Sequence, residues 1–206
     1  MPVSTAKLYI DYKSPYAYLA VEPAYRLARE TGLQIDWLPY TLDIPAYLGS
    51  AEVDADGRVL AENRNSHQWR RVKYSYMDVR REANRLGLTI LGPKKIYNSR
   101  IAHIGMLHAK RQGVLRPYND TVFQKFFRRE LDIENPETIA GVLRDCGADI
   151  SGFQDFLDGE GPKTLLAIQH DAESNGVFGV PSVLFPDGTL FWGREHFSRI
   201  REHLAE

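Results

Sequence analysis

A chain of 206 residues is long enough to bury one complete hydrophobic core, and 26 Lys and Arg against 27 Asp and Glu leave it a formal net charge of −1. A near-neutral chain lacks the basic field of proteins that hold nucleic acid through many phosphate contacts, so we expect no nucleic-acid partner. Its 43% hydrophobic and 26% charged residues are typical of a folded globular protein and exclude the disordered and fibrous classes.

The lone cysteine, Cys146, excludes an internal disulfide and a Cys-x-x-Cys pair, and with them dithiol redox chemistry by the chain's own sulfurs. We expect no metal site, because His103 and His108 would face different sides of a helix. The apolar residues around His108 favour a hydrogen-bonded core histidine instead. No signal-like segment and no run of about 18 apolar residues is found, so we expect a cytoplasmic protein without a membrane partner.

The N-terminal segment predicts a strand, a helix and a second strand. Lys7–Tyr12 alternates with the period of two expected of a strand. Ser14 suits an N-cap and Pro15 the first helical position, so a helix should start directly after that strand. Pro23 is expected to kink or restart the helix, and Gln34–Tyr40 is the next predicted strand.

The middle of the chain is predicted to be helical. Asp43–Val59 has no sustained period, so we expect an irregular binding loop with a short hairpin around Asp56–Gly57. From Asn65 to about Ala172, apolar residues recur at helical spacing. One apolar stripe is favoured as core, although it is also the best candidate for a homodimer contact; it comprises Trp69, Val72, Tyr76, Val79, Ala83 and Leu86.

Short strands return at the C-terminal end. A helix over Pro162–Ser174 precedes two predicted strands, Ser182–Phe185 and Thr189–Phe191, which are joined by a hairpin turn at Asp187–Gly188. A last amphipathic helix follows them. Because sheet elements lie at both ends of the chain, the expected fold class is α/β, with one mixed sheet and a large all-helical insertion instead of two independent domains.

Ser14 places a hydroxyl between the carboxyl end of a strand and the N-terminus of a helix. Unpaired N–H groups and the helix dipole stabilise an anion there, and the hydroxyl can donate a further hydrogen bond. The plainer interpretation is that Ser14 only caps the helix by accepting from the N–H of Ala17. At the other end of the chain, Val180–Pro181 enters a strand, either as an ordinary trans bond or as a cis bond that presents the backbone to a peptide-like ligand.

Together these two segments look like the two halves of a thioredoxin-fold active site. The chain resembles the disulfide-oxidoreductase-like branch of the thioredoxin superfamily, and within it the 2-hydroxychromene-2-carboxylate isomerases and the kappa-class glutathione transferases. Ser14-Pro15-Tyr16-Ala17 stands where redox members carry Cys-Pro-x-Cys. The other matching segments span nearly the whole chain: Tyr18-Leu19-Ala20, Asp78-Val79-Arg80-Arg81, Asn98, Gly176–Ser182 and Phe191-Trp192-Gly193. The resemblance implies a discontinuous thioredoxin-like domain, residues 1–62 and 160–206, with a helical subdomain inserted at residues 63–159.

The resemblance also implies that the protein takes from glutathione the reactive thiol that it lacks. Ser14 and the helix N-terminus would hold the sulfur as a thiolate, with Val180–Pro181 against it. In the resembling isomerases the thiolate adds to a conjugated carbon, the former double bond rotates, and elimination releases the product. Asn98 and either Lys13 or Tyr16 would meet the carboxylate and carbonyl of a small-molecule substrate. For Lys13, an ordinary solvated surface lysine is the favoured alternative.

One departure from the family concerns the γ-glutamyl end of glutathione. After Phe-Trp-Gly the family usually has an amide or small residue and then Asp, whereas this chain has Arg194 and Glu195. Glu195 retains a carboxylate on a longer stem, and Arg194 could pair with a ligand carboxylate by a two-pronged bond. The alternative is that both begin a solvated helix. The loop between Thr41 and Asn63 also departs from the family's proline- and glycine-rich form, so the substrate is not transferred.

Three functions stay open at this point. The leading one is a glutathione-dependent isomerase acting on an aromatic or conjugated carboxylate, and the second is a kappa-like glutathione transferase or peroxidase that uses the same thiolate. The third is a non-catalytic thioredoxin-like binding module, of which Arg194-Glu195 would be the first sign. A homodimer is expected. Cys146 is expected to be structural, because it shares the apolar face of a predicted helix.

Overall fold

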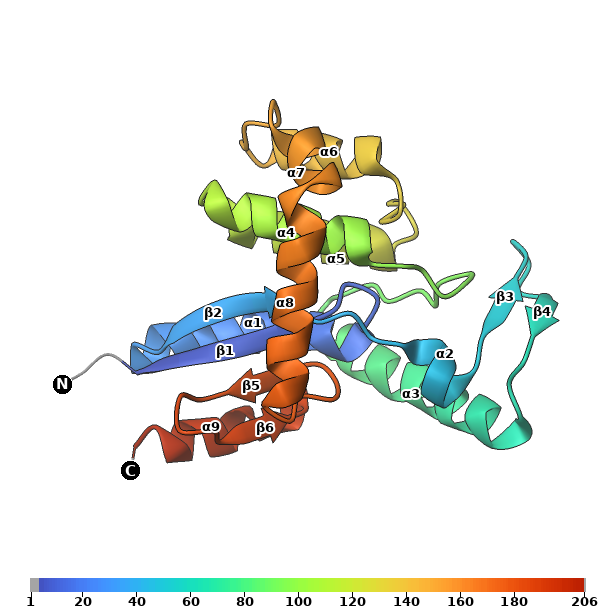
Figure 1. Ribbon diagram of the computed structural model, residues 1–206. Helices are drawn as coiled ribbons and strands as arrows, with labels where there is room; N and C mark the ends of the chain where they lie inside the picture. Colours follow the sequence, from blue (N-terminus) through green and yellow to red (C-terminus); the bar gives the residue numbers. More distant parts are fainter. Residues whose placement is uncertain (1–3, 206) are drawn as a thin grey trace.

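The computed structural model describes residues 4–205, and it confirms one mixed sheet built from both ends of the chain (Figure 1). β1 (Thr5–Ile10) pairs in parallel with β2 (Gln34–Pro39) and antiparallel with β5 (Ser182–Leu184). β5 pairs antiparallel with β6 (Leu190–Trp192), so the strand order is β2-β1-β5-β6. The pairing of β1 with β5 brings the segment after β1 next to the segment before β5.

The central strand is buried on both faces. α8 (Glu160–Ser174) crosses in front of the strands in Figure 1, and α1 (Pro15–Thr31) lies behind them. Tyr9 is therefore as fully buried as its neighbours Leu8 and Ile10. Strands covered by helices on both faces carry buried side chains at consecutive positions. The burial continues past the end of β1 and includes a charged side chain, that of Asp11.

α1 begins as predicted and runs further than predicted. The Ser14 side chain accepts from the N–H of Ala17 at 3.2 Å, and Pro15 occupies the first helical position. Of the two alternatives at Pro23, a restart is wrong, because one helix runs through it to a left-handed Gly32. The packing of one continuous buried face outweighs the hydrogen bond that proline removes; that face carries Ala17, Leu19, Ala20, Ala24 and Leu27.

Aromatic rings fix the start of α1 against α5 (Leu115–Phe127). The Tyr18 ring stacks on Phe123 and Phe127, with ring centroids 5.3 Å and 5.5 Å apart. Just before the helix, the buried Tyr12 hydroxyl donates to the side-chain oxygen of Asn119 at 2.6 Å. Buried aromatic pairs of this kind contribute roughly 0.5–1.5 kcal/mol each beyond the area that they bury. The N-terminus of α1 is therefore held on a rigid support.

α4 (Arg100–Arg111) lies at the centre of the remaining helices, where it contacts α5, α6 (Pro136–Asp145), α7 (Phe153–Asp158) and α8. His108 is buried there, with its Nε2 2.8 Å from the carbonyl oxygen of Asp149, which confirms a hydrogen-bonded core histidine. The predicted helical period is interrupted, since residues 86–99 form no helix. Gly87, at a φ of 68°, ends the preceding helix, and Pro93 lies within the interruption.

The segment predicted as an irregular loop contains a helix and a hairpin. α2 (Ile44–Leu48) leads into β3 (Ala51–Val53), which pairs antiparallel with β4 (Val59–Glu62) and confirms the hairpin expected around Asp56–Gly57. This hairpin stands beside α2 and α3 (Ser66–Arg85), away from the four-stranded sheet (Figure 1). α3 packs on α1 and α2. The division into residues 1–62 and 160–206 and a helical subdomain at residues 63–159 stays a prediction.

The apolar stripe of α3 is core over only part of its length. Val79 and Ala83 are buried, as predicted, but Leu86 is exposed. The stripe's first half, Trp69, Val72 and Tyr76, lines a cavity instead. After β6, a 3-10 turn η1 (Arg194–His196) leads into the short helix α9 (Phe197–His203), which packs on α1.

Candidate functional site

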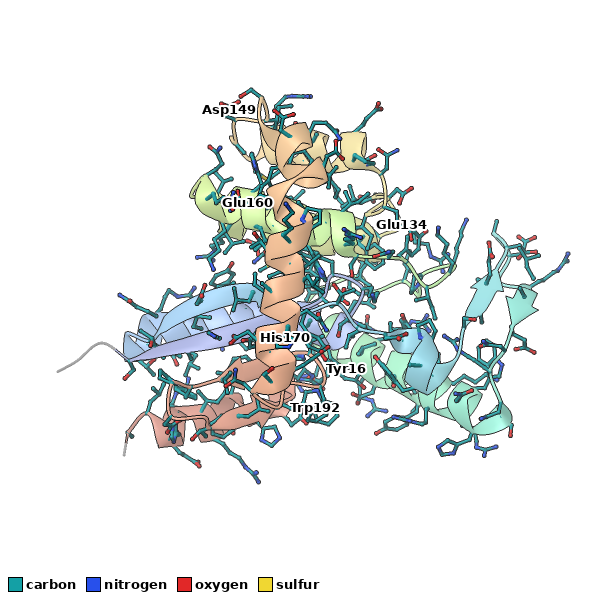
Figure 2. The ribbon with its side chains drawn as sticks, in the orientation of Figure 1. Tyr16, Glu134, Asp149, Glu160, His170 and Trp192 are labelled. Atoms are coloured by element: carbon teal, nitrogen blue, oxygen red, sulfur yellow. The ribbon has the colours of Figure 1, made fainter. Side chains whose placement is uncertain are left out.

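A cavity of about 810 Å³ lies between the start of α1, α2, α3 and the segment before β5. Its volume is within the roughly 300–1,000 Å³ typical of small-molecule sites. Lys13, Ser14, Tyr16 and Val180, all predicted site residues, line it. Figure 2 shows Tyr16, on the first turn of α1, at the same end of the sheet as Trp192 of β6. The two sequence segments that were predicted to meet therefore face one cavity.

Ser14 is a helix cap with an unused donor. Its side chain is buried, and its oxygen accepts from the N–H of Ala17. Within residues 4–205 no acceptor lies in hydrogen-bond reach of its hydroxyl hydrogen or of the backbone N–H of Tyr16. Both donors sit at the positive end of the dipole of a 17-residue helix. The capping interpretation is thus correct, and it leaves the site able to receive an anion.

The Val180–Pro181 bond is cis, which is the second of the two alternatives given for this segment. Neither the N–H nor the C=O of Val180 has a backbone partner among the described residues. Gly179 lets the Trp192 indole approach closely, because a Cβ on Gly179 would lie 2.7 Å from its Nε1. Phe178 packs on Trp192 with ring centroids 4.9 Å apart, and both rings are exposed at the cavity rim. The sequence reasoning did not place these two aromatic residues in the site.

Lys13 is not a surface lysine, and the favoured solvated interpretation is wrong. Its side chain is only 5% exposed, with Nζ 3.3 Å from a carboxylate oxygen of Asp11 and 3.3 Å from the Ser99 hydroxyl. It follows β1 in a tight turn under the start of α4, and the side chain is covered there. A buried ammonium needs such partners, because an unpaired one would cost several kcal/mol.

Asp11 is the buried anion beneath the site. Its carboxylate accepts from the N–H of Leu42 at 2.8 Å and of Lys13 at 3.1 Å, and it lies 3.4 Å from His103 Nε2. Burial by itself would raise the pKa of Asp11. The charges of His103 and Lys13 together with the hydrogen bonds outweigh it and hold that pKa well below its ordinary range. His103 Nδ1 lies 2.9 Å from the Thr41 hydroxyl, so the His103 side chain also contacts the loop after β2.

Tyr16 is a neutral phenol at the cavity. Its hydroxyl donates to Asp78 of α3 at 3.1 Å. Burial, and then the nearby negative charge of Asp78, raise the pKa of Tyr16 to about 12. The hydroxyl therefore stays protonated at neutral pH, and the Asp78 contact joins α3 to the first turn of α1.

Four predicted site residues do not line the cavity. Asn98 is exposed, with its side-chain oxygen accepting from the N–H of Arg100 and its own N–H donating to Glu134 at 2.6 Å. Arg194 pairs with Glu82 of α3 at 3.4 Å. Glu195 is exposed at the start of η1. Pro181 is buried behind Val180 and presents no side chain to the cavity wall.

The cavity wall carries basic and apolar side chains. No Asp or Glu among the described residues lines it, and eight Lys or Arg residues do; these are Lys13, Arg64, Arg71, Lys73, Arg80, Lys94, Lys95 and Arg129. A cleft lined by charges of one sign concentrates ligands of the other sign. Residues 4–205 hold no group of three His, Cys, Asp or Glu that could bind a metal ion, and none of their helices could span a membrane. The site is therefore suited to an anionic ligand with an apolar body.

We expect replacement of Cys146 by Ala to leave any activity of this cavity within a few-fold of the parent. Cys146 is half-buried outside the cavity wall, and its sulfur lies 3.9 Å from the Thr121 hydroxyl. Burial raises the pKa of its thiol, which makes a reactive thiolate scarce at neutral pH. Turnover of the purified variant checks this, and complete loss of turnover by a folded variant would contradict it.

The four-stranded sheet, the cis proline and a capped helix N-terminus facing the cavity define a thioredoxin-fold protein. The family model of the DSBA-like thioredoxin domain matches residues 5–205, and the chain belongs to that family. It is 29% identical over 191 residues to a 2-hydroxychromene-2-carboxylate isomerase of Pseudomonas putida, covering 91% of this chain and 87% of the relative. A protein of the same name from Sphingobium xenophagum is 26% identical, with 98% of each chain covered.

Among solved structures, that of an HCCA isomerase (2-hydroxychromene-2-carboxylate isomerase) matches with a TM-score of 0.75 at 25% identity, covering 98% of this chain and 94% of the other. The resemblance indicated by the sequence motifs is thereby confirmed. The helices between the two parts of the sheet belong to the match as well, since nearly the whole chain is covered.

Proposed function

We propose that this protein is a glutathione-dependent isomerase of aromatic or conjugated carboxylates. The observation that carries the proposal is the helix N-terminus at Ser14. It offers unused donors to a cavity that, among residues 4–205, is lined by cations and apolar side chains and by no carboxylate. Its relatives named 2-hydroxychromene-2-carboxylate isomerase support the reaction class. The glutathione requirement is supported by the lack of a thiol in the described cavity wall, since Cys146 lies outside it and cannot serve as the nucleophile.

The residues present fit glutathione. The unpartnered N–H and C=O of Val180 suit the backbone of a peptide-like ligand, which can add as an extended strand. The Ser14 hydroxyl and the Tyr16 N–H would donate to its sulfur. When bound, glutathione would supply a thiolate nucleophile that the chain itself lacks. The γ-glutamyl end would extend toward Trp192, where Arg194 is already paired with Glu82. Glu195, whose carboxylate lies 4.0 Å from His196 Nε2, would meet its ammonium group.

The chain's own groups have separate tasks in this proposal. Ser14 and the helix dipole hold negative charge at the sulfur position and lower its pKa. Lys13 brings positive charge to the same end of the cavity, and Asp11 keeps that ammonium in place. The Tyr16 phenol, which is protonated at neutral pH, donates to Asp78 and would have to turn away from it to donate to a substrate carbonyl oxygen. The Phe178 and Trp192 rings shield this end of the cavity from water.

The proposal is tested by following 2-hydroxychromene-2-carboxylate by absorbance with and without glutathione. We expect conversion with glutathione, and none with S-methylglutathione, which has the same backbone and no free thiol. Conversion that is equally fast without glutathione would contradict the cofactor role. Conjugation of glutathione to an electrophile such as 1-chloro-2,4-dinitrobenzene, without any isomerisation, would establish the kappa-like transferase instead. Failure to bind glutathione at all would favour a binding module. The homodimer and the cytoplasmic location stay predictions.

A further inference from the structure

Three arginines converge on one part of the cavity wall. Arg64 lies just before α3, Arg80 lies within α3, and Arg129 follows α5. The Arg80 guanidinium lies 5.7 Å from the centre of the Tyr76 ring, and both Arg80 and Tyr76 lie beside Gly92, whose carbonyl accepts from Arg129. Burial raises the pKa of Tyr76 to about 12, and the three positive charges are near enough to oppose that rise. We call Arg64, Arg80 and Arg129 the arginine cluster. It is built from elements other than those that carry Ser14 and Val180.

Each of these arginines is held by a backbone carbonyl and by no carboxylate. Arg64 Nε donates to Leu48 O at 3.0 Å, Arg80 Nε to Ile90 O at 3.5 Å, and Arg129 Nε to Gly92 O at 2.8 Å. None of the three forms an ion pair with an Asp or Glu of the described residues, which is unlike Arg111 or Arg201 on the surface. A guanidinium has five N–H donors, so each keeps donors that these carbonyls do not use.

The backbone at Arg129 directs this side chain toward the cavity wall. Its φ is 63°, and no other non-glycine residue in 4–205 has a positive φ. This left-handed residue ends α5, with the N–H of Glu130 donating to the carbonyl of Lys125 at 2.8 Å. Here the conformation turns the chain after α5 so that the guanidinium reaches the Gly92 carbonyl at the cavity wall. A glycine would adopt the turn more easily but would bring no charge.

We propose that the arginine cluster binds a second carboxylate of the substrate, so that the substrate is an aromatic or conjugated dicarboxylate. This inference rests on the proposed function; the first carboxylate would lie near Lys13, at the end of the cavity where Ser14 faces the thiol of glutathione. The apolar part of the wall that includes Val72, Ile96 and Tyr97 would hold the ring system between the two anionic groups. Arginine forms planar two-pronged bonds with carboxylates. Because the three arginines of the cluster have no counter-ion among the described residues, they favour a ligand group that carries a full negative charge.

Two other roles for the cluster are separable by experiment. The arginines could serve only to hold the carbonyls of the 90–92 segment and of Leu48, or they could receive a carboxylate of glutathione. In the first case their loss would lower stability and would leave ligand preference unchanged. In the second case their loss would weaken the binding of glutathione. It would change the affinity for substrates with one and with two carboxylates equally.

The test compares biphenyl-4-carboxylate with biphenyl-4,4′-dicarboxylate by isothermal titration calorimetry. The two probes share one ring system and differ in the second carboxylate. For the parent protein we expect the dicarboxylate to bind about tenfold more tightly. The Arg80→Gln/Arg129→Gln variant should bind the two probes within about twofold of each other and should bind glutathione like the parent. The Arg80→Lys/Arg129→Lys variant should keep part of the preference, because it keeps the charge and loses the planar fork.

The matched control is Arg128→Gln, which removes an exposed arginine next to Arg129 that does not line the cavity. It should keep the full preference for the dicarboxylate. Equal binding of both probes by the parent would overturn the proposal, and so would a preference that survives in the double Gln variant. Loss of glutathione binding in the double variant would assign the cluster to glutathione instead. Because probe binding requires neither glutathione nor turnover, failure of the isomerase proposal leaves this test intact. Melting curves report any loss of folding.

Discussion

Ser14→Ala is expected to lower glutathione-dependent turnover at about pH 7 by roughly tenfold or more, with most of the loss recovered at alkaline pH. The variant removes the hydroxyl donor and keeps the helix N-terminus, so the thiol pKa of bound glutathione should rise toward the free value of about 8.5. Below that pKa, each unit of increase lowers the thiolate fraction about tenfold. Turnover measured over a range of pH, with the pH at half-maximal rate as the readout, checks the expectation.

The same variant separates a catalytic hydroxyl from a cap. Loss of the hydrogen bond to the N–H of Ala17 should cost about 0.5–2 kcal/mol of folding stability whatever the function. If Ser14→Ala melts lower but shows the parent's pH profile and rate, Ser14 is only a cap. Ser14→Cys gives a further contrast: Ala17 provides no second thiol, so a mixed disulfide with glutathione should accumulate under oxidising conditions.

Asp11→Asn is expected to cost roughly 3–5 kcal/mol of folding stability, because it leaves the Lys13 ammonium buried without its counter-ion. In a chain of this length, that corresponds to a fall in Tm of roughly 6–20 °C. The pKa of Asp11 is lower in the folded protein than in the unfolded chain, so its contribution is complete above the unfolded value of about 3.9 and is lost as the pH falls toward the folded value. The difference in Tm between parent and variant should therefore narrow below about pH 4.

The matched control for this prediction is Asp36→Asn. Asp36 pairs with Lys110 at the surface, where a salt bridge contributes only about 0–1 kcal/mol. Adding Lys13→Met to Asp11→Asn should recover part of the lost stability, since it removes the unpaired charge. A small effect of Asp11→Asn at neutral pH, equal to that of Asp36→Asn, would show that the buried pair does not stabilise the fold.

The predictable part of the fold is the part with local signals. The Ser14-Pro15 cap, the Asp187–Gly188 turn and the short strands are specified by neighbouring residues, and the structure has them where the sequence reasoning placed them. A restart at Pro23 was wrongly allowed because local propensity cannot register the packing of a whole helix face. Lys13 was misjudged because its burial depends on α4, which lies far along the chain.

The site was predicted where it depends on backbone motifs and missed where it depends on long-range assembly. Ser14 and Val180 come together because β1 and β5 are paired neighbours. The buried contact between Asp11 and His103 joins residues from two elements that no sequence period connects, and His103 had been considered only as a metal ligand. The residues that form the basic wall were visible only as separate charges, since α3, the 92–97 segment and Arg129 meet through tertiary packing.

The most direct measurement of the central claim is an ultraviolet titration of the thiol of glutathione bound to the parent protein, with the protein saturated. The account predicts that the bound thiol titrates one to two units below the free value of about 8.5, because Ser14 and the α1 N-terminus favour its anion. A bound thiol that titrates at the free value, or the absence of any saturable binding, would contradict it.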